Sequence, residues 1–222
     1  MFLGKAQEYL ILITHFCNLI IIISKEYVFT CRYICYKIYN KDIKLLKTKE
    51  MIYMISKKLE TALNDQINFE FYSAHFYLAM AAYCSSIDLD GFANFFTVQA
   101  EEEKFHAMKF FNYLSQMDGR VILTGMPDPK FEFSSVAEVF EDALAHEKIV
   151  TSRIYNLSDL AFEEREHATI SLLKWFIDEQ VEEEKNLNTI IKKIKRIGDN
   201  SASLYLLDNE LAARVFVPPT NA

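Results

Sequence analysis

The stretch EEEKFHAMKFF, residues 101–111, lies in a segment whose apolar residues recur with helical spacing. Phe96, Glu103 and Phe110 follow one another at intervals of seven residues, and His106 falls three residues after Glu103. Residues at these intervals share one face of a helix, and an apolar face of this period is normally buried. The sequence therefore predicts a carboxylate and an imidazole inside a hydrophobic core.

Glycine and proline are sparse after residue 53, and they divide this part of the chain into long uninterrupted segments. We expect four long helices and a short fifth one, over residues 56–84, 91–117, 135–163, 167–197 and 201–212. Short links join the first helix to the second and the third helix to the fourth, so each of these two pairs should form an antiparallel hairpin. The link over residues 118–134 can extend about 55 Å, which exceeds the roughly 42 Å of a 28-residue helix. The predicted fold is all-α, a four-helix bundle with one long crossover connection plus a short C-terminal helix.

Two boundaries carry their own signals. Ser135 is followed three residues later by Glu138, which is the spacing of a capping box at the start of the third helix. Gly198 follows the last apolar residue of the fourth helix and is a natural residue for its end.

Each of the other long helices also has a polar residue in the middle of its apolar stripe. The stripes are Leu63, Glu70, Tyr77 and Cys84 in the first helix, Phe140, Leu144, Glu147 and Ile154 in the third, and Phe176, Gln180, Glu183 and Leu187 in the fourth. A single Glu-x-x-His pair is common on solvated helix faces, and a single tyrosine is usually a core residue. The prediction of a site depends on all four stripes being interrupted at compatible heights.

Buried carboxylates require compensation of their charge. An unpaired ionised carboxylate in a core costs several kcal/mol, and four of them together would largely take up protons. Two divalent cations shared by four carboxylates, one imidazole and one amide would leave the core nearly neutral. Oxygen donors with one nitrogen suit iron better than structural zinc, which favours cysteine and histidine. The pattern therefore predicts a two-iron site.

The composition limits the partners and the compartment. The net charge of the 222-residue chain is −7, which argues against binding to nucleic acid. Residues 1–53 carry eight Lys/Arg and four Asp/Glu, whereas the remaining residues carry sixteen and twenty-seven. Cys84 is the one cysteine after residue 53, so this part has no internal disulfide and a reducing, cytoplasmic location is expected.

Residues 1–53 are interpreted as an N-terminal extension outside the fold, and residues 54–222 as the helical bundle. Residues 9–23, YLILITHFCNLIIII, form an apolar run of about 15 residues, where a membrane-spanning helix needs roughly 20. No small-residue cleavage pattern follows the run. The extension is either upstream translation, with Met51 or Met54 as the real start, or a hydrophobic segment that targets or anchors the chain. Upstream translation is the favoured interpretation.

At these residues the sequence resembles the bacterial non-haem ferritins, over about residues 54–213. The resemblance is carried by NDQINFEFYSAHFYLAMA, AEEEKFHAMKFFNYL, ALAHEKI and WFIDEQVEEEKN. It implies an iron-storage protein that oxidises Fe(II) to Fe(III) with dioxygen or hydrogen peroxide. The product would be stored as a hydrated ferric oxide inside a hollow shell of twenty-four identical subunits. The fifth helix would line a four-fold channel of that shell.

The resemblance also implies roles for individual residues. Glu70, Glu103 and His106 would hold the first iron, and Glu103 would bridge to a second iron near Glu147 and Gln180, with Tyr77 beside the pair. A third iron site of the family matches Glu102, Glu179, Glu182 and Glu183, a set that could equally form a solvated acidic face.

Haem is not expected. Bacterioferritins carry a haem-ligating methionine directly after the glutamate of the second helix, where this chain has Lys104. They also repeat Glu-x-x-His on the fourth helix, where this chain reads Gln180-Val181-Glu182-Glu183.

The alternative function is that of a non-catalytic structural bundle, or of a bundle tethered to a membrane through residues 9–23. A structural bundle predicts scattered polar substitutions in the core. The sequence instead keeps one complete set of iron ligands, which favours the ferroxidase.

Overall fold

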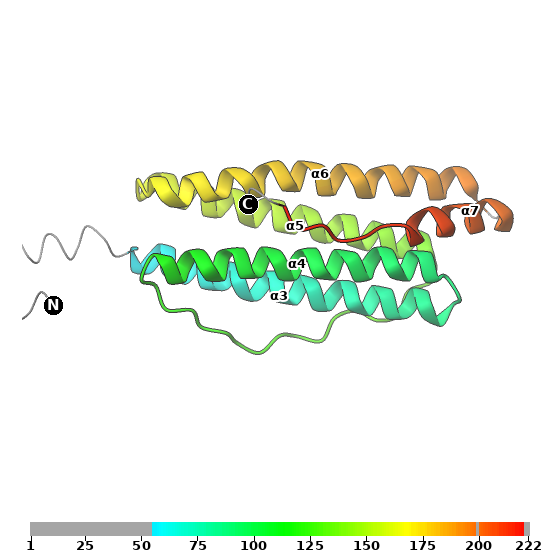
Figure 1. Cartoon of the computed structure of the whole chain (residues 1–222), viewed down its shortest axis with the longest axis horizontal. Helices are drawn as coiled ribbons and strands as arrows, with labels where there is room; N and C mark the ends of the chain where they lie inside the picture. Colours follow the sequence, from blue (N-terminus) through cyan, green and yellow to red (C-terminus); the bar gives the residue numbers. More distant parts are fainter. Residues whose placement is uncertain (1–54, 199, 220–222) are drawn as a thin grey trace, which may run out of the picture. The chain divides into compact units, whose positions relative to one another are not determined.

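The computed structural model describes residues 55–198 and 200–219. Its helices are α3 (Lys57–Ser86), α4 (Asp90–Gln116), α5 (Val136–Glu163), α6 (His167–Ile197) and α7 (Ser201–Ala212). Figure 1 shows α3 packed antiparallel to α4, and α5 antiparallel to α6. The predicted all-α bundle with a long crossover and a short fifth helix is confirmed, and every predicted helix end lies within two residues of the observed one.

The predicted extension over residues 1–53, with its apolar run and possible starts, lies outside the described residues. Among the residues that are described, no helix is both long and apolar enough to cross a membrane.

Side-chain caps and one glycine set the ends of the helices. Ser135 caps α5 as expected, because its hydroxyl accepts a hydrogen bond from the Glu138 N–H at 3.2 Å. The Glu138 carboxylate reaches back to the N–H of Ser134 at 2.6 Å, so the capping box closes one residue earlier than its sequence spacing suggests. Gly198 ends α6 with a φ of 55°, a backbone conformation that side-chain-bearing residues rarely adopt.

The link between α4 and α5 is bound to α3 by asparagine side chains. Oδ1 of Asn64 accepts from the N–H of Ile122 at 2.6 Å, and its Nδ2 donates to the Arg120 carbonyl at 2.9 Å. One turn later, Asn68 accepts from the N–H of Thr124 at 2.8 Å and donates to the Ile122 carbonyl at 2.8 Å. Two residues of extended chain, about 6.6 Å, match four residues of helix, about 6.0 Å. The link can therefore follow α3 as it returns along the bundle (Figure 1).

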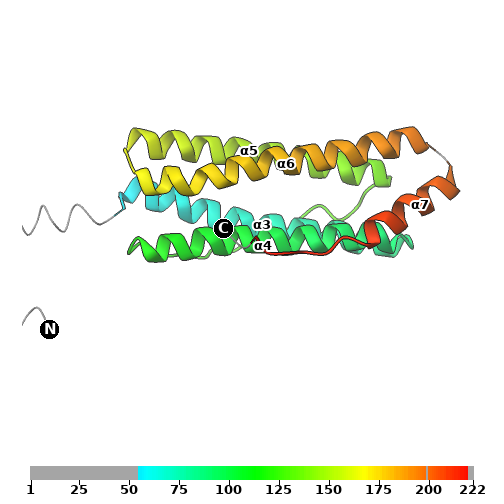
Figure 2. The same ribbon diagram turned by 45° about the horizontal axis from the view of Figure 1, so that its top comes forward.

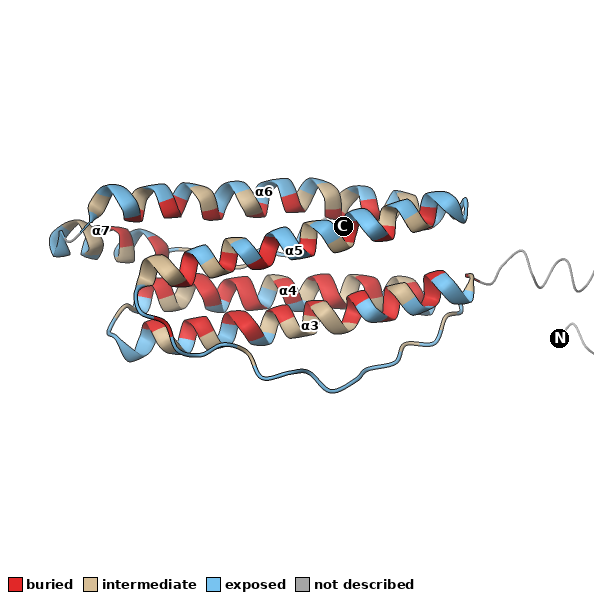
Figure 3. Cartoon of the chain, turned by 180° about the vertical axis from the view of Figure 1, so that it is seen from behind, coloured by how far each residue is buried: buried red, intermediate tan, exposed pale blue. Residues whose placement is uncertain are grey.

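The core consists of two apolar clusters separated by a polar layer. One cluster includes Tyr77, Phe96 and Phe140, towards the end of the bundle where α7 lies. The other includes Leu63 and Phe110, towards the opposite end. Eight buried polar side chains from the four long helices lie between the two clusters along the sequence of their helices: Glu70, Ser73, Glu103, His106, His146, Glu147, Gln180 and Glu183. In Figure 3 the buried residues form stripes along the facing sides of the helices.

The helix α7 and the segment after it pack against α4. The N–H of Phe92 donates to Oδ1 of Asp208 at 3.0 Å. A Cβ on Gly91 would lie 1.7 Å from the Asp208 carbonyl oxygen, so this approach requires glycine. Residues 213–219 then run back along α4, and both Figure 1 and Figure 2 show this path.

Candidate metal centre

Three predicted ligands meet in the polar layer. Glu70 of α3 and Glu103 and His106 of α4 are buried, and one ligand atom from each lies within 4.8 Å of the other two. The distance from Nδ1 of His106 to Oε2 of Glu103 is 3.6 Å. Among the residues that the structure describes, no other group of three or more Asp, Glu, His or Cys side chains brings its ligand atoms this close together.

Several oxygens of this group have no hydrogen-bond partner. Oε2 of Glu70 and both carboxylate oxygens of Glu103 are buried without one. The other oxygen of Glu70 accepts from Nε2 of Gln66 at 2.8 Å. A buried acceptor without a partner costs about 1–3 kcal/mol, and a charged one costs more. The three carboxylate oxygens without a partner are therefore suited to bind a cation.

The environment makes the imidazole neutral and the carboxylates weak acids. Burial lowers the pKa of His106 to about 4, and Lys109 lowers it further in the same direction. A neutral imidazole has the free lone pair that a metal ion needs. Burial is also the main cause that raises the pKa of Glu70 to about 7. Burial, followed by the charges of Glu147 and Glu70, raises the pKa of Glu103 well above its ordinary value.

Glu147 of α5 and Gln180 of α6, also predicted as ligands, are buried but are not part of this group of three. Burial raises the pKa of Glu147 to about 7, and the hydroxyl of Tyr77, which donates a hydrogen bond to its Oε1, opposes this shift. Hydrogen bonding orients the Gln180 amide so that Nε2 donates to Oε2 of Glu147 at 3.2 Å and to Oγ1 of Thr151 at 3.0 Å.

The four glutamates predicted for a third iron differ in exposure. Glu183 is buried, Glu102 and Glu179 are half-buried, and Glu182 is exposed. Burial raises the pKa of Glu102, and the charges of Glu179 and Glu182 act in the same direction. Arg214, from the segment after α7, forms an ion pair with Glu102. The sequence reasoning did not anticipate a cation among these carboxylates.

Comparison with known proteins identifies the family. The sequence profile of the family described as Ferritin-like domain matches residues 60–197. The chain belongs to the ferritin family. It is 53% identical over 163 residues to the bacterial non-heme ferritin of Staphylococcus saprophyticus, covering 73% of this chain and 98% of that protein. Its identity to the bacterial non-heme ferritin of Staphylococcus aureus strain USA300 is 50%, with the same coverage. The resemblance to bacterial non-haem ferritins is thus confirmed.

Solved ferritin structures have the same fold. An engineered closed form of the Archaeoglobus fulgidus ferritin superimposes with a TM-score of 0.73 and 45% identity, over 73% of this chain and 99% of that one. The open-pore ferritin of the same archaeon gives a TM-score of 0.72 and 45% identity, over 72% of this chain and 99% of that one.

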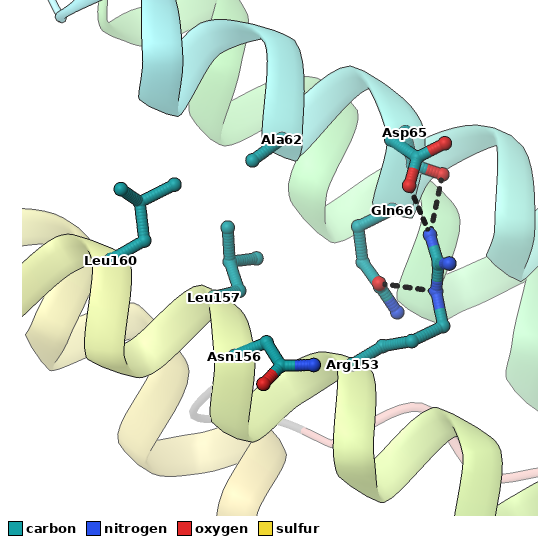
Figure 4. A pocket seen from close by; sticks show the side chains of 7 residues that line it. All are labelled: Ala62, Asp65, Gln66, Arg153, Asn156, Leu157 and Leu160. Carbon is teal, nitrogen blue, oxygen red and sulfur yellow. Dashed lines mark hydrogen bonds and ion pairs between the residues drawn. The ribbon is translucent and has the colours of Figure 1, made fainter.

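In this ferritin an arginine and a glutamine hold Glu70 in place. Nε of Arg153 donates to Oε1 of Gln66 at 3.1 Å, and the amide of Gln66 in turn donates to Glu70. The guanidinium of Arg153 also forms an ion pair, at 2.6 Å, with the exposed carboxylate of Asp65. Figure 4 shows Asp65, Gln66 and Arg153 at a pocket of about 220 Å³ between α3 and α5. The sequence reasoning did not identify this chain of contacts.

A matching arrangement holds Glu183. Nε2 of Gln99 donates to Oε2 of Glu183 at 2.8 Å, and Oε1 of Gln99 accepts from Nη1 of Arg214 at 2.6 Å. Gln66 could have been noticed in the sequence, because it precedes its partner Glu70 by four residues, one helical turn. Gln99 has the same spacing to Glu103, but it donates to Glu183 of α6 instead.

Proposed function

We propose that this ferritin stores iron and that its polar layer is a ferroxidase centre, at which two Fe(II) ions are oxidised to Fe(III). The ligands would be Glu70, Glu103, His106, Glu147 and Gln180, with Tyr77 as a catalytic neighbour. The observation that carries the proposal is the set of three unpartnered carboxylate oxygens beside a neutral buried imidazole. This set is costly without a cation, and it offers the oxygen and nitrogen donors that iron accepts.

The contacts of each side chain indicate its role. Glu103 has both oxygens free and can bridge two ions. Glu70 has one oxygen held by Gln66 and one free, so it can bind one ion through a single oxygen. The hydroxyl of Tyr77 donates a hydrogen bond to Oε1 of Glu147, which would orient this carboxylate for a second ion.

The oxidation balances with either oxidant. Each Fe(II) gives one electron, and dioxygen takes up both electrons with two protons to form hydrogen peroxide. With hydrogen peroxide as the oxidant, the same two electrons and two protons give two molecules of water. The Fe(III) would then leave the pair and accumulate as a hydrated ferric oxide.

Storage of the product requires an enclosed space. We propose that twenty-four copies of the chain form a hollow shell in the cytoplasm and that α7 lines a four-fold channel. The support for the shell is the identity of about 50% to bacterial non-heme ferritins over 98% of their length. Carboxylates that could bind a third iron, Glu102, Glu179, Glu182 and Glu183, would then lie beside the pair.

Stopped-flow oxidation of Fe(II), followed at the ferric absorption band, tests the centre. His106→Ala and Glu103→Ala should each abolish the rapid phase while the particle size in gel filtration stays unchanged. Glu101→Ala is the matched control, because Glu101 is an exposed carboxylate on the same helix. An unchanged initial rate in Glu103→Ala would refute the proposed centre.

A further inference from the structure

We propose that Arg214 is a built-in counter-ion of the predicted third iron site, and that an incoming metal ion must displace it. This inference rests on the proposed function, because it concerns the third ion that would bind beside the ferroxidase pair. The segment after α7 would thereby take part in metal binding, although it contains none of the proposed ligands.

The guanidinium of Arg214 contacts one of the four glutamates directly and is linked to a second through Gln99. Nη2 forms an ion pair with the Glu102 carboxylate directly. Nη1 donates to Oε1 of Gln99 at 2.6 Å, and Nε2 of Gln99 donates to Glu183 at 2.8 Å. The carbonyl of Phe95 accepts a further hydrogen bond from Nη1 at 3.3 Å. The arginine thus holds Glu102 itself and holds Glu183 through the Gln99 amide.

Contacts on both sides of Arg214 keep it in this position. Its carbonyl accepts from Nδ2 of Asn94 at 2.9 Å. Two residues later, the ring of Phe216 packs 5.9 Å from that of Phe105. The guanidinium also lies 4.4 Å from the centre of the Phe95 ring. Residues 213–219 are therefore anchored along α4, and the arginine side chain is only 22% exposed.

A divalent ion and this guanidinium compete for the same carboxylate. A metal ion at the third site needs the lone pairs of Glu102, and in the observed structure the arginine engages one oxygen of that carboxylate. Two positive groups on one carboxylate also repel each other. Metal binding therefore requires Arg214 to move away, which also releases Gln99 and frees Glu183 to turn. This competition makes the third ion bind after the pair and more weakly than the pair.

Anaerobic titration of the metal-free assembled protein with Co(II), followed by calorimetry and by the visible Co(II) absorption, tests the competition. We expect two tighter ions and one weaker ion per subunit in the unaltered chain. Arg214→Ala should tighten binding of the third ion by roughly tenfold or more, since a charge-assisted hydrogen bond no longer has to be broken. Arg214→Lys keeps the charge but cannot reach Glu102 and Gln99 together, so it should give an intermediate affinity.

Arg196→Ala is the control, because it removes the same charge from an exposed position on α6. A third-ion affinity in Arg214→Ala that equals that of Arg196→Ala, or is weaker, would overturn the inference. Should Arg214→Ala fail to assemble, an unchanged third-ion affinity in Arg214→Lys would overturn it instead. Absence of the two tighter ions in the unaltered chain would refute the proposed function and this inference with it, whereas an unchanged third ion beside an intact pair refutes this inference alone.

Discussion

Replacing Glu70 by glutamine should stabilise the metal-free bundle at pH 8 and should have little effect at pH 4. Glu70 is fully buried, and burial raises its pKa from 4.5 to about 7. Glutamine has nearly the same shape, and its oxygen can still accept the hydrogen bond from Gln66. The substitution therefore removes the ionisation of the side chain while its packing is kept.

The size of the effect follows from proton linkage. Between pH 4.5 and 7 the unfolded chain has released the Glu70 proton while the folded chain still holds it, so the free energy of unfolding falls as the pH rises through this window. Each pKa unit corresponds to about 1.4 kcal/mol, so the shift of about 2.5 units costs the folded protein about 3 kcal/mol above pH 7. Below pH 4.5 the Glu70 carboxyl is protonated in both the folded and the unfolded chain, so this loss of stability is absent. The free energy of unfolding of Glu70→Gln, relative to that of the unaltered protein, should therefore rise by about 3 kcal/mol between pH 4 and pH 8.

Guanidinium unfolding of chelator-treated protein at both pH values measures this gain. Subunit concentrations must be matched, because assembly makes the apparent stability depend on concentration. Glu101→Gln, at an exposed position, is the control for removing a carboxylate. The reasoning is refuted if Glu70→Gln gains no more stability than Glu101→Gln on going from pH 4 to pH 8. With saturating Co(II), Glu70→Gln should be less stable than the unaltered protein, because the variant has lost a metal ligand.

Three further predictions concern the limits of the site. A protein that begins at Met54 should fold, assemble and oxidise iron, because all the proposed ligands lie on the described helices; a product that is insoluble or stays monomeric would contradict this. Glu102→Ala combined with Glu179→Ala should keep the first rapid oxidation of two irons per subunit and change the later turnover in stopped flow, and loss of the first phase, as expected for His106→Ala, would place these glutamates in the pair. Gln66→Leu should weaken Co(II) binding about 10- to 100-fold, because the Glu70 carboxylate loses the amide that orients it; an unchanged affinity would limit Gln66 to packing.

The arrangement of the bundle could be predicted because its determinants are local. Residues with helical periodicity fill each helix, and breakers such as Gly198 mark the ends. The length of the link over residues 118–134 leaves one simple way to join two hairpins. The same periodicity places Glu70 and Glu103 on inward faces, where the structure buries both completely.

The contacts that orient the ligands could not be predicted in this way. Arg214 lies 112 residues from Glu102 in the sequence, and Arg153 lies 87 residues from Gln66. Long flexible side chains can reach several partners, and spacing along one helix does not indicate which residue of another segment they meet. The carboxyl-terminal segment also lacks periodicity, so its path along α4 depends on packing that only the folded chain shows.

The asparagine contacts between α3 and the link have a consequence for the alignment of the two hairpins. A slip of the link by two residues would bring its backbone to the next asparagine and would shift the start of α5 by about one helical turn, near 6 Å. The slip would cost hydrogen bonds at the far end of the ladder, because the residue four positions after Asn68 is Tyr72, which has no amide for the Ile122 carbonyl and the Thr124 N–H that Asn68 now holds. The link, a segment without helix or strand, thus helps to set the height of Glu147 on α5 relative to Glu70 on α3, and so the alignment of the two halves of the proposed metal centre.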